Sequence, residues 1–439
     1  MQTKLDRITE LAKRDKKCRF KNLMHLLNKD NLKECFYRLR KDSSSGNDGM
    51  SWREYEARLD ERLENLVTRM KKWSYRPQPV RRVYIPKSNG KLRPLGIPAI
   101  EDKIVQMAIA RILTAIYEID FMDISYGFRP GKRSHDALER LDYMIKWNPV
   151  SYVIDADIKG FFDNMNHKWM VRMLEERISD PHLLRLIKRF LKNSYLEYGK
   201  EHKAEQGTPQ GGVMSPVLAN IYLHYVLDIW FVKIVKKQMD GFVGMVRYAD
   251  DYIICARYKH EAEETLRVLK DRLGKFGLEL AEDKTKLIGF GRYAVEKSRR
   301  QGKKAGTFDF LGFTHFSDKD RKGGFKVGRK TERKRFAVKM REMYLWLKDA
   351  RKQKPKYWWQ ILCAKMRGHY QYYGVSGNYC GINRFYEETR RHLFKWMNRR
   401  SQRRSFNWER FLQYLERFTL PKPRIYRNLY VNRSYRGER

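Results

Sequence analysis

Residues 243–256 read Val-Gly-Met-Val-Arg-Tyr-Ala-Asp-Asp-Tyr-Ile-Ile-Cys-Ala. Both ends of this stretch are short, apolar and partly β-branched, which predicts two strands, 243–248 and 252–256, around a tight turn. The turn consists of Ala249, Asp250 and Asp251, although tight turns between strands favour Gly or Asn. Its composition therefore indicates that function, rather than turn geometry, selected these residues.

The segments around this hairpin predict further strands and helices. Residues 152–157 predict a strand, and helical patterns follow from His167 to Phe190. Another helix is expected to start at Ser215-Pro216, with Ser215 as its N-cap. After the hairpin, apolar residues recur at spacings of three and four and predict an amphipathic helix: Ala262, Leu266, Leu269, Leu273 and Phe276.

A last strand is expected near residues 278–280 or 287–290. The resulting order of strand, helices, strand, strand, helix and strand is that of the ferredoxin-like split βαβ plan. In this plan the hairpin lies beside the first strand. Asp155 and Asp157, at the end of that strand, should therefore lie close to the two aspartates of the turn.

Four carboxylates in one place are costly unless they bind cations. Oxygen ligands with open coordination positions suit Mg²⁺. Two such ions, about 3.5–4 Å apart, stabilise the attacking and leaving oxygens of a phosphoryl displacement. The pattern therefore predicts a Mg²⁺-dependent phosphoryl-transfer site.

The overall charge points to a polyanionic partner. The 439 residues include 94 Lys+Arg and 52 Asp+Glu, a net charge of +42. Residues 321–439 alone hold 33 Lys+Arg and 8 Asp+Glu, interleaved with aromatic residues. Such a surface suits nucleic acid, and we expect most of these aromatic residues to form a helical core beneath the charges.

A membrane partner is not expected. The most apolar stretch, Val217–Val232, is interrupted by Asn220, His224 and Asp228, and the N-terminus has no signal-peptide pattern. The five cysteines lie far apart in the sequence, which predicts neither a zinc site nor disulfides. A cytoplasmic location is expected, nucleoid-associated or within a ribonucleoprotein.

Several motifs resemble those of reverse transcriptases. Tyr248-Ala-Asp-Asp251 is similar to the signature of that class, and other motifs resemble group II intron-encoded reverse transcriptases (maturases) in the same order along the chain. These motifs are Ile85–Pro98, Ser125–Pro130, Asp155–Asp163, Gly207–Pro216 and Phe310–Phe313. The resemblance covers residues 45–315.

The resemblance implies an α+β right-hand polymerase with fingers and a ferredoxin-like palm, followed by a helical thumb and maturase domain. It implies four domains: 1–75, a mainly helical N-terminal extension with a break at 43–49; 76–315, fingers and palm; 316–390, thumb; and 391–439, a basic RNA-binding part. Segments 297–306 and 318–330 are expected to be loops or boundaries.

The resemblance also assigns the catalytic residues. Asp157, Asp250 and Asp251 are the catalytic carboxylates, and with the carbonyl of Ile158 they hold two Mg²⁺ ions, for which Mn²⁺ is a possible substitute. Asp155 belongs to the motif, and a structural role for it stays open.

Six residues are expected to bind the incoming nucleotide: Lys87, Arg93, Ile158, Phe162, Gln210 and Lys284. Phe162 matches the steric gate against a ribose 2′-hydroxyl, with a core aromatic as the alternative. Lys284 resembles the lysine that protonates pyrophosphate, with a surface lysine as the alternative. Lys87 and Arg93 are expected on a hairpin that turns at residues 88–90.

Contacts with template or RNA are expected at five positions: Asn47, Gly49, Arg129, Gly211 and Tyr372. For the segment 46–50, an ordinary loop stays open as the alternative.

The resemblance therefore predicts an RNA-directed DNA polymerase that binds a group II intron RNA and assists splicing and retrohoming by target-primed synthesis. Its partners would be intron RNA, an RNA template with a DNA primer, target DNA and dNTPs, with monomer and dimer both open. Two alternatives remain: an RNA-binding splicing cofactor, or a domesticated defence or repair enzyme with other templates. No Cys-pair endonuclease pattern follows Leu420–Arg424, so endonuclease activity is not expected.

Overall fold

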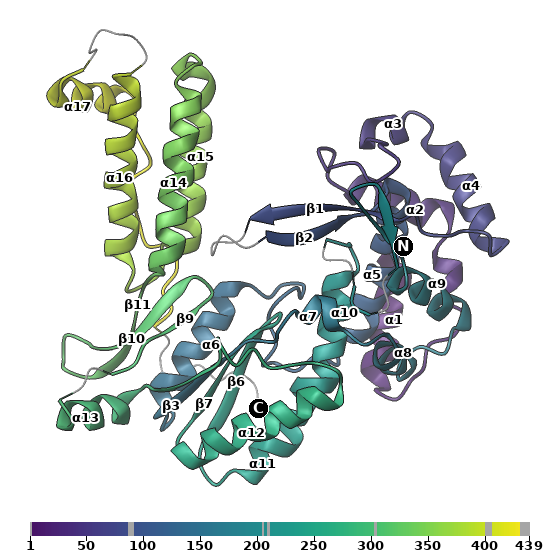
Figure 1. Cartoon of the computed structure of the whole chain (residues 1–439), viewed down its shortest axis with the longest axis horizontal. Coiled ribbons are helices and arrows are strands. Elements are labelled where there is room, and N and C mark those ends of the chain that lie inside the picture. The colour runs from purple at the N-terminus through teal and green to yellow at the C-terminus, as the bar shows by residue number, and fades with distance from the viewer. Residues whose placement is uncertain are drawn as a thin grey trace. The chain divides into compact units, whose positions relative to one another are not determined.

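The computed structural model describes residues 2–86, 92–203, 206–208, 211–302, 305–399 and 406–430, without the side chains of residues 297 and 299. The chain divides into two compact units (Figure 1). The first consists of Met1–Ala137, Ala156–Ile254 and His260–Lys286, and the second of Leu138–Asp155, Cys255–Lys259 and Leu287–Arg439. The predicted four-domain division follows other boundaries and stays a prediction.

The amino-terminal part of the first unit is helical. Its elements are α1 (Gln2–Arg14), η1 (Met24–Leu26), α2 (Lys29–Arg38), α3 (Trp52–Glu56) and α4 (Leu59–Lys71). Residues 39–51, all described, form no helix, which confirms the predicted break. Ser51 and Glu54 then form a capping box that starts α3.

A four-stranded sheet follows, with the order β2-β1-β4-β5. Its strands are β1 (Val80–Pro86), β2 (Leu92–Ile97), β4 (Tyr195–Glu197) and β5 (Lys200–His202). β1 and β2 form the predicted antiparallel hairpin, in which Ile85 pairs with Arg93. Helix α5 (Ile100–Tyr117) continues from β2 and is buried along most of its length.

The motif strands form a second sheet with the order β6-β7-β3-β8. They are β3 (Tyr152–Ala156), β6 (Val243–Tyr248), β7 (Asp251–Ala256) and β8 (Lys286–Gly289). The hairpin β6-β7 lies beside β3, so this order confirms the ferredoxin-like plan, and the last strand is the second of the two predicted segments.

The helices between these strands are α7 (Phe161–Asn164), α8 (His167–Glu175), α9 (Pro181–Leu191), α10 (Ser215–Leu223), η2 (His224–Asp228), η3 (Phe231–Val235), α11 (Lys236–Gln238) and α12 (Lys259–Lys275). The predicted N-cap of α10 is wrong: Met214 holds that position. Ser215 is the first residue of the helix, and its hydroxyl bonds the Thr208 hydroxyl at 2.9 Å.

Helices α10 to α11 form one segment, Ser215–Gln238, that is long and apolar enough to cross a membrane by length and composition alone. In its most apolar window, 72% of the residues are buried inside the protein, as in a core helix. The polar residues that interrupt it are buried as well: Asn220, His224 and Asp228.

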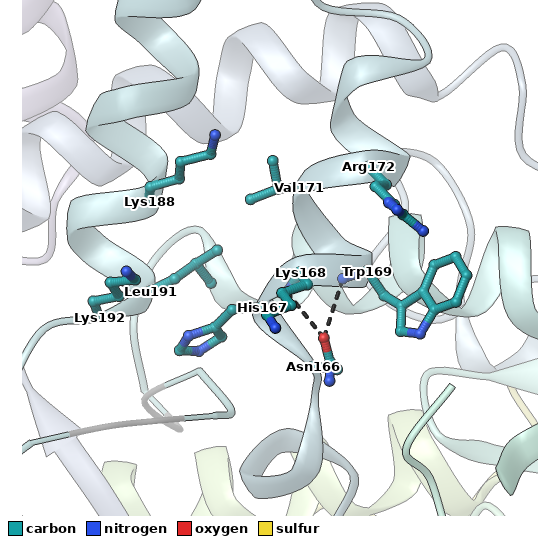
Figure 2. A pocket seen from close by; sticks show the side chains of 9 residues that line it. All are labelled: Asn166, His167, Lys168, Trp169, Val171, Arg172, Lys188, Leu191 and Lys192. Atoms are coloured by element: carbon teal, nitrogen blue, oxygen red, sulfur yellow. Dashed lines mark hydrogen bonds between the residues drawn. The ribbon is translucent and has the colours of Figure 1, made fainter. Parts of the chain in front are cut away.

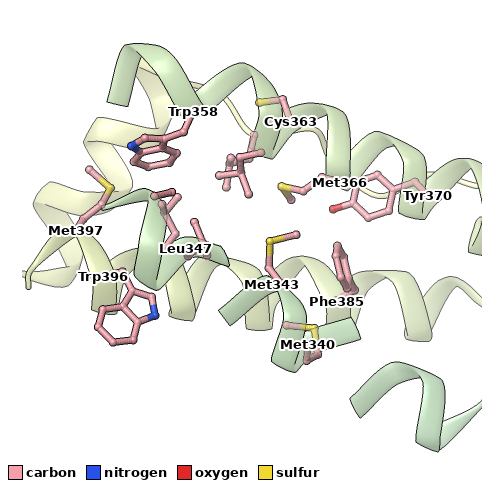
Figure 3. Packing of buried hydrophobic residues seen from close by; sticks show 14 of the residues in the cluster. Met340, Met343, Leu347, Trp358, Cys363, Met366, Tyr370, Phe385, Trp396 and Met397 are labelled. Carbon is pink, nitrogen blue, oxygen red and sulfur yellow. The ribbon is translucent and has the colours of Figure 1, made fainter. Parts of the chain in front are cut away.

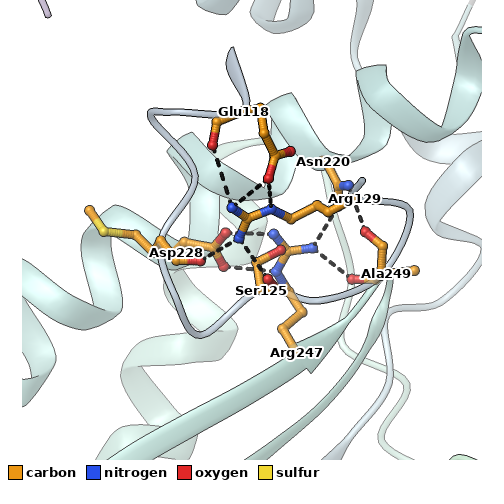
Figure 4. Close-up of polar contacts among 9 residues, drawn as sticks. Glu118, Ser125, Arg129, Asn220, Asp228, Arg247 and Ala249 are labelled. Atoms are coloured by element: carbon orange, nitrogen blue, oxygen red, sulfur yellow. Dashed lines mark hydrogen bonds and ion pairs between the residues drawn. The ribbon is translucent and has the colours of Figure 1, made fainter. Parts of the chain in front are cut away.

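A buried ion pair joins this helix to β6 (Figure 4). Arg247 donates from Nε to Asp228 Oδ1 at 2.8 Å, and both side chains are fully buried. The same guanidinium donates from Nη1 to Asn220 Oδ1 at 3.2 Å and to the carbonyl of Ala249 at 2.9 Å. The ion pair therefore reaches the backbone of the turn that carries the aspartates.

Arg129 organises the neighbouring loop in the same way (Figure 4). It donates from Nε to Glu118 Oε1 at 2.9 Å and from Nη1 to the Ser125 carbonyl at 2.7 Å. Ser125 forms an isolated bridge with Arg247, so this loop lies against β6. The two arginines therefore fix the loop and the turn together.

The second unit contains a small sheet with the order β11-β10-β9: β9 (Phe308–Phe310), β10 (Phe313–Lys319) and β11 (Phe325–Thr331). The prediction of a loop at 318–330 is wrong, because most of this segment pairs as the antiparallel hairpin β10-β11. The start of the other predicted loop, 297–306, belongs to α13 (Arg292–Arg300). Helix α6 (Ser134–Trp147) precedes β3.

Four helices complete the second unit: α14 (Arg333–Ala350), α15 (Pro355–Tyr373), α16 (Tyr379–Met397) and α17 (Trp408–Arg417). Their core is rich in aromatic and sulfur-containing residues, as Figure 3 shows for Trp358, Tyr370, Phe385 and Trp396. This confirms that the aromatic residues of the basic C-terminal part mainly pack inside it.

The buried ion pair generates a stability prediction. Asp228→Leu or Arg247→Met alone should lower the free energy of unfolding by about 3–5 kcal/mol, because each leaves an unpaired buried charge. The double variant should lose less than the sum of the two, as measured by urea denaturation in a double-mutant cycle.

The exposed pair Arg267–Glu264 provides the control, since removing either partner should change stability little. Additive effects of the two buried substitutions would contradict the assigned coupling.

Candidate active site

A cavity of about 520 Å³ lies in the first unit, and residues of several predicted motifs line it. It is lined by Arg93, Pro94, Leu95, Phe128, Asp157, Ile158, Gly160, Phe161, Phe162, Asp163, Gly211, Gly212, Ser215, Pro216, Asp250 and Lys284. These residues come from β2, the end of β3, α7, the start of α10 and the β6-β7 turn. The cavity therefore joins segments that are distant in sequence.

The turn that carries Asp250 has an unusual backbone. Ala249 has φ +59°, a conformation that residues with a Cβ rarely adopt. Arg247 holds its carbonyl, and Gly127 lies so close that an added Cβ would be 2.2 Å from the Ala249 nitrogen. The turn is therefore held from two sides, and its geometry is not left to its own residue preferences.

The second carboxylate, Asp157, follows β3. Its backbone carbonyl accepts a hydrogen bond from Ala281 N at 2.8 Å, and the next residue, Ile158, forms a bridge with Leu280. The segment that leads to Lys284 is thereby fixed beside Asp157. Lys284 Nζ then forms an ion pair with the Asp157 carboxylate.

The electrostatics of the site couple these groups. Burial raises the pKa of Asp250, a hydrogen bond from its own backbone opposes this, and the nearby Asp157 charge raises the pKa further. The hydrogen bond to Asp157 raises the pKa of Lys284, with a smaller contribution from Asp251. Lys284 is therefore a cation held between acidic groups.

The donor atoms at the cavity bear on whether a divalent cation could bind there. Within the described ranges, no group of three or more His, Cys, Asp or Glu side chains is arranged to hold a metal ion. Two hard oxygen donors, Asp157 and Asp250, nevertheless line one cavity, and the Lys284 ammonium already supplies positive charge beside one of them. This donor chemistry fits a divalent cation.

The other two predicted carboxylates lie differently. Asp251 is exposed at the start of β7 and does not line the cavity. Asp155 belongs to the second unit.

Three predicted nucleotide-binding residues, besides Lys284, line the cavity: Arg93, Ile158 and Phe162. The Phe162 carbonyl accepts from Thr208 N at 2.8 Å, which fixes the glycine-containing loop behind it. Lys87 and Gln210 lie outside the described residues.

Glycine is required at two positions of this loop. Gly207 has φ +84°, and an added Cβ would be 2.6 Å from the Asp163 carbonyl. Gly211 has φ +108°, and an added Cβ would be 2.8 Å from the Gly96 carbonyl. Both close approaches bring backbone, rather than side chains, to the edge of the cavity.

The predicted template contacts are spread over the chain. Asn47 and Gly49 are exposed and do not line the cavity, whereas Gly211 does. Tyr372 lies in the second unit, where its hydroxyl donates to the Leu311 carbonyl at 2.9 Å. Arg129 is buried and its guanidinium is bonded to Glu118 and to the Ser125 carbonyl, so its predicted template contact stays a prediction.

Some site residues were missed by sequence reasoning. Phe128 lines the cavity with φ +58° and half of its surface exposed; it lies within the motif Ser125–Pro130, but no role was predicted for it. Asn220, Asp228 and Arg247 position the turn, and their signal was visible as polar residues inside the apolar stretch Val217–Val232.

Comparisons with known proteins agree with this geometry. The group II intron-encoded protein LtrA of Lactococcus lactis subsp. cremoris is 45% identical over 166 residues, which is 38% of this chain and 27% of LtrA. Protein YkfC of Escherichia coli K12 is 34% identical over 297 residues, 58% of this chain and 77% of YkfC. Nuclear intron maturase 4, mitochondrial, of Arabidopsis thaliana is 30% identical over 134 residues, 29% of this chain and 16% of the maturase.

The match thus spans about a quarter of the length of LtrA. These relatives confirm the resemblance to group II intron-encoded reverse transcriptases that the motifs indicated. Residues 85–315, more than half of the chain, match the family described as reverse transcriptase (RNA-dependent DNA polymerase). The chain therefore belongs to the reverse transcriptase family.

Proposed function

We propose that this chain is an RNA-directed DNA polymerase whose catalytic centre is the cavity that contains Asp157 and Asp250. One observation carries the proposal: two carboxylates, a paired lysine, Arg93 and a glycine-rich backbone segment line the same cavity in a member of the reverse transcriptase family. Phosphoryl transfer needs such a combination of cation-binding and phosphate-binding groups.

Reverse transcriptases generally use divalent metal ions. Two Mg²⁺ ions, or Mn²⁺ in their place, held by Asp157 and Asp250 with Asp251 and the Ile158 carbonyl, would stabilise charge on the attacking and leaving oxygens. In the reaction, the primer 3′-oxygen bonds to the α-phosphorus of a dNTP, the α–β phosphoanhydride bond breaks, and pyrophosphate leaves.

The chain's own side chains orient the nucleotide and move a proton. Arg93 is exposed at the cavity and binds triphosphate oxygens by charge-assisted hydrogen bonds. Phe162 excludes a ribose 2′-hydroxyl. Lys284 carries a proton at neutral pH, as lysines ordinarily do, and its hydrogen bond to Asp157 raises its pKa further. It gives that proton to the leaving pyrophosphate.

A second function, binding of a group II intron RNA in support of splicing and target-primed mobility, is favoured by the charge distribution. Residues 321–439 hold 33 basic and 8 acidic residues. Their aromatic residues mainly form the core, which leaves the charges for phosphates. The names of LtrA and of the plant maturase point to the same class of partner. A cytoplasmic ribonucleoprotein with target DNA as a further partner belongs to this proposal.

Asp250→Asn should lower the rate of primer extension on an RNA template by about 10³-fold or more, because one of the two cavity carboxylates loses its charge. RNA binding should stay within about twofold, since the carboxylate makes no favourable contact with phosphates. Single-turnover extension and filter binding measure the two effects.

Asp240→Asn is the matched control, because Asp240 is exposed and does not line the cavity. Near-normal extension by the Asp250 variant would overturn the proposed catalytic centre. Loss of intron splicing in that variant, with RNA binding intact, would speak against a separate splicing role.

Asp250→Asn should also remove a pH-dependent part of the free energy of unfolding. This is measured in EDTA, so that no divalent cation binds the carboxylate. Burial raises the pKa of Asp250 in the folded chain above its usual value of 3.8, so ionisation of this group destabilises the fold. The stability of the wild type relative to the variant should therefore fall as the pH rises from about 4 through the raised pKa. Urea denaturation across this range measures it, and a constant difference would contradict the assigned burial effect.

Phe162→Ala should raise incorporation of ribonucleotides relative to deoxyribonucleotides by about 10- to 100-fold, because a ring at the cavity wall is removed. The ratio of kcat/KM for dNTP and rNTP measures this change. Tyr198→Ala serves as the control, since Tyr198 is 91% exposed and lies outside the cavity. An unchanged ratio in the Phe162 variant would assign that ring to packing alone.

A further inference from the structure

A second cavity of the first unit, about 590 Å³ in volume, has no role in the chemistry described above. Residues of α8 and of the end of α9 surround it (Figure 2). It is lined by Asn166, His167, Lys168, Trp169, Val171, Arg172, Lys188, Leu191 and Lys192. We call the space that these residues line the α8–α9 cavity.

The charge of this cavity is of one sign. Its four exposed cationic side chains are Lys168, Arg172, Lys188 and Lys192, and no acidic residue lines it. Lys188 approaches Glu175 only to 3.9 Å. Among the described residues, the other three form no ion pair, so the cavity presents charges that a polyanion would neutralise.

The cavity also holds a fixed aromatic ring. Trp169 is half-buried and packs on Phe276 with ring centroids 4.7 Å apart. Arg172 lies over the indole, 5.3 Å from its centroid. Leu191 adds a buried apolar side chain to the wall. A cation beside an immobilised ring is the combination that binds phosphates and stacks bases of single strands.

One hydrogen bond connects the α8–α9 cavity to the catalytic cavity. His167 donates from Nε2 to the Gly207 carbonyl at 2.6 Å, and Gly207 N in turn donates to the Met165 carbonyl at 2.8 Å. Gly207 begins the loop whose Gly211 lines the catalytic cavity. Burial lowers the pKa of His167, so the ring stays a neutral donor at physiological pH.

We propose that the α8–α9 cavity binds the unpaired part of the RNA template ahead of the catalytic cavity. The cations contact successive phosphates, and Trp169 stacks on a base. This inference rests on the proposed function, since a polymerase that copies RNA holds one strand unpaired on the side from which the template enters. The primer is paired at the catalytic cavity, so the template is the strand that fits a single-strand site.

The test compares two RNA–DNA primer duplexes, one with a template overhang of about 12 nucleotides and one with a single-nucleotide overhang. The variant Lys168→Gln/Arg172→Gln/Lys192→Gln removes three exposed charges. It should weaken binding of the long-overhang duplex by on the order of tenfold and reduce the salt dependence of log K by about 2. Binding of the short-overhang duplex, and single-nucleotide incorporation on it, should stay near wild type.

The control variant Lys233→Gln/Lys236→Gln/Lys237→Gln removes the same number of exposed charges from the far end of the Ser215–Gln238 helix. It should affect both duplexes equally and weakly. Equal losses for the two triple variants, or equal losses on the two duplexes, would overturn the proposal.

A loss confined to a folded RNA hairpin would also overturn it, and would assign the cavity to structured RNA instead. The binding measurement needs no catalysis. If the wild type binds the overhang through this cavity but extends no primer, the proposed function fails while the single-strand site stands.

Discussion

Arg247 and Asp228 form a fully buried ion pair on which the position of the catalytic turn depends. The guanidinium has more donors than the carboxylate can use. Nε and Nη2 bond Asp228, and Nη1 donates to the Ala249 carbonyl and to Asn220. A hydrophobic pair of the same volume would fill the space without holding the backbone of the turn. The strained φ of Ala249 persists because this donor and the close approach of Gly127 leave the turn little alternative.

The catalytic cavity and the α8–α9 cavity are connected through one segment of backbone that is held where no side chain fits. Gly207 lies against the Asp163 carbonyl, and Gly211, which lines the catalytic cavity, lies against the Gly96 carbonyl. His167, from the α8–α9 cavity, fixes one end of this segment through its bond to Gly207.

Much of the palm was predictable from the sequence, because the motif strands carry strong local signals. The alternation of β3, β6, β7 and β8 with helices led to the correct strand order. The ion pair between Asp157 and Lys284 was not predicted, because the resemblance assigned each residue a role without placing the two side chains together. The role of Arg129 was not predictable, since a motif does not say whether a charged side chain faces solvent or its own loop. The hairpin at 313–331 was missed because its glycines and charges read as a loop, whereas cross-strand pairing decided its structure.

The buried carboxylate of Asp228 also sets the order in which the chain can complete its core during synthesis. Its partner Arg247 lies 19 residues further along, after the whole apolar helix has been made. At about 5–20 residues per second, the ribosome needs about one to four seconds to add that interval. For that time the helix holds an unpaired acid that cannot be buried favourably, so this segment of the nascent chain should depend on chaperones that shield exposed apolar surface.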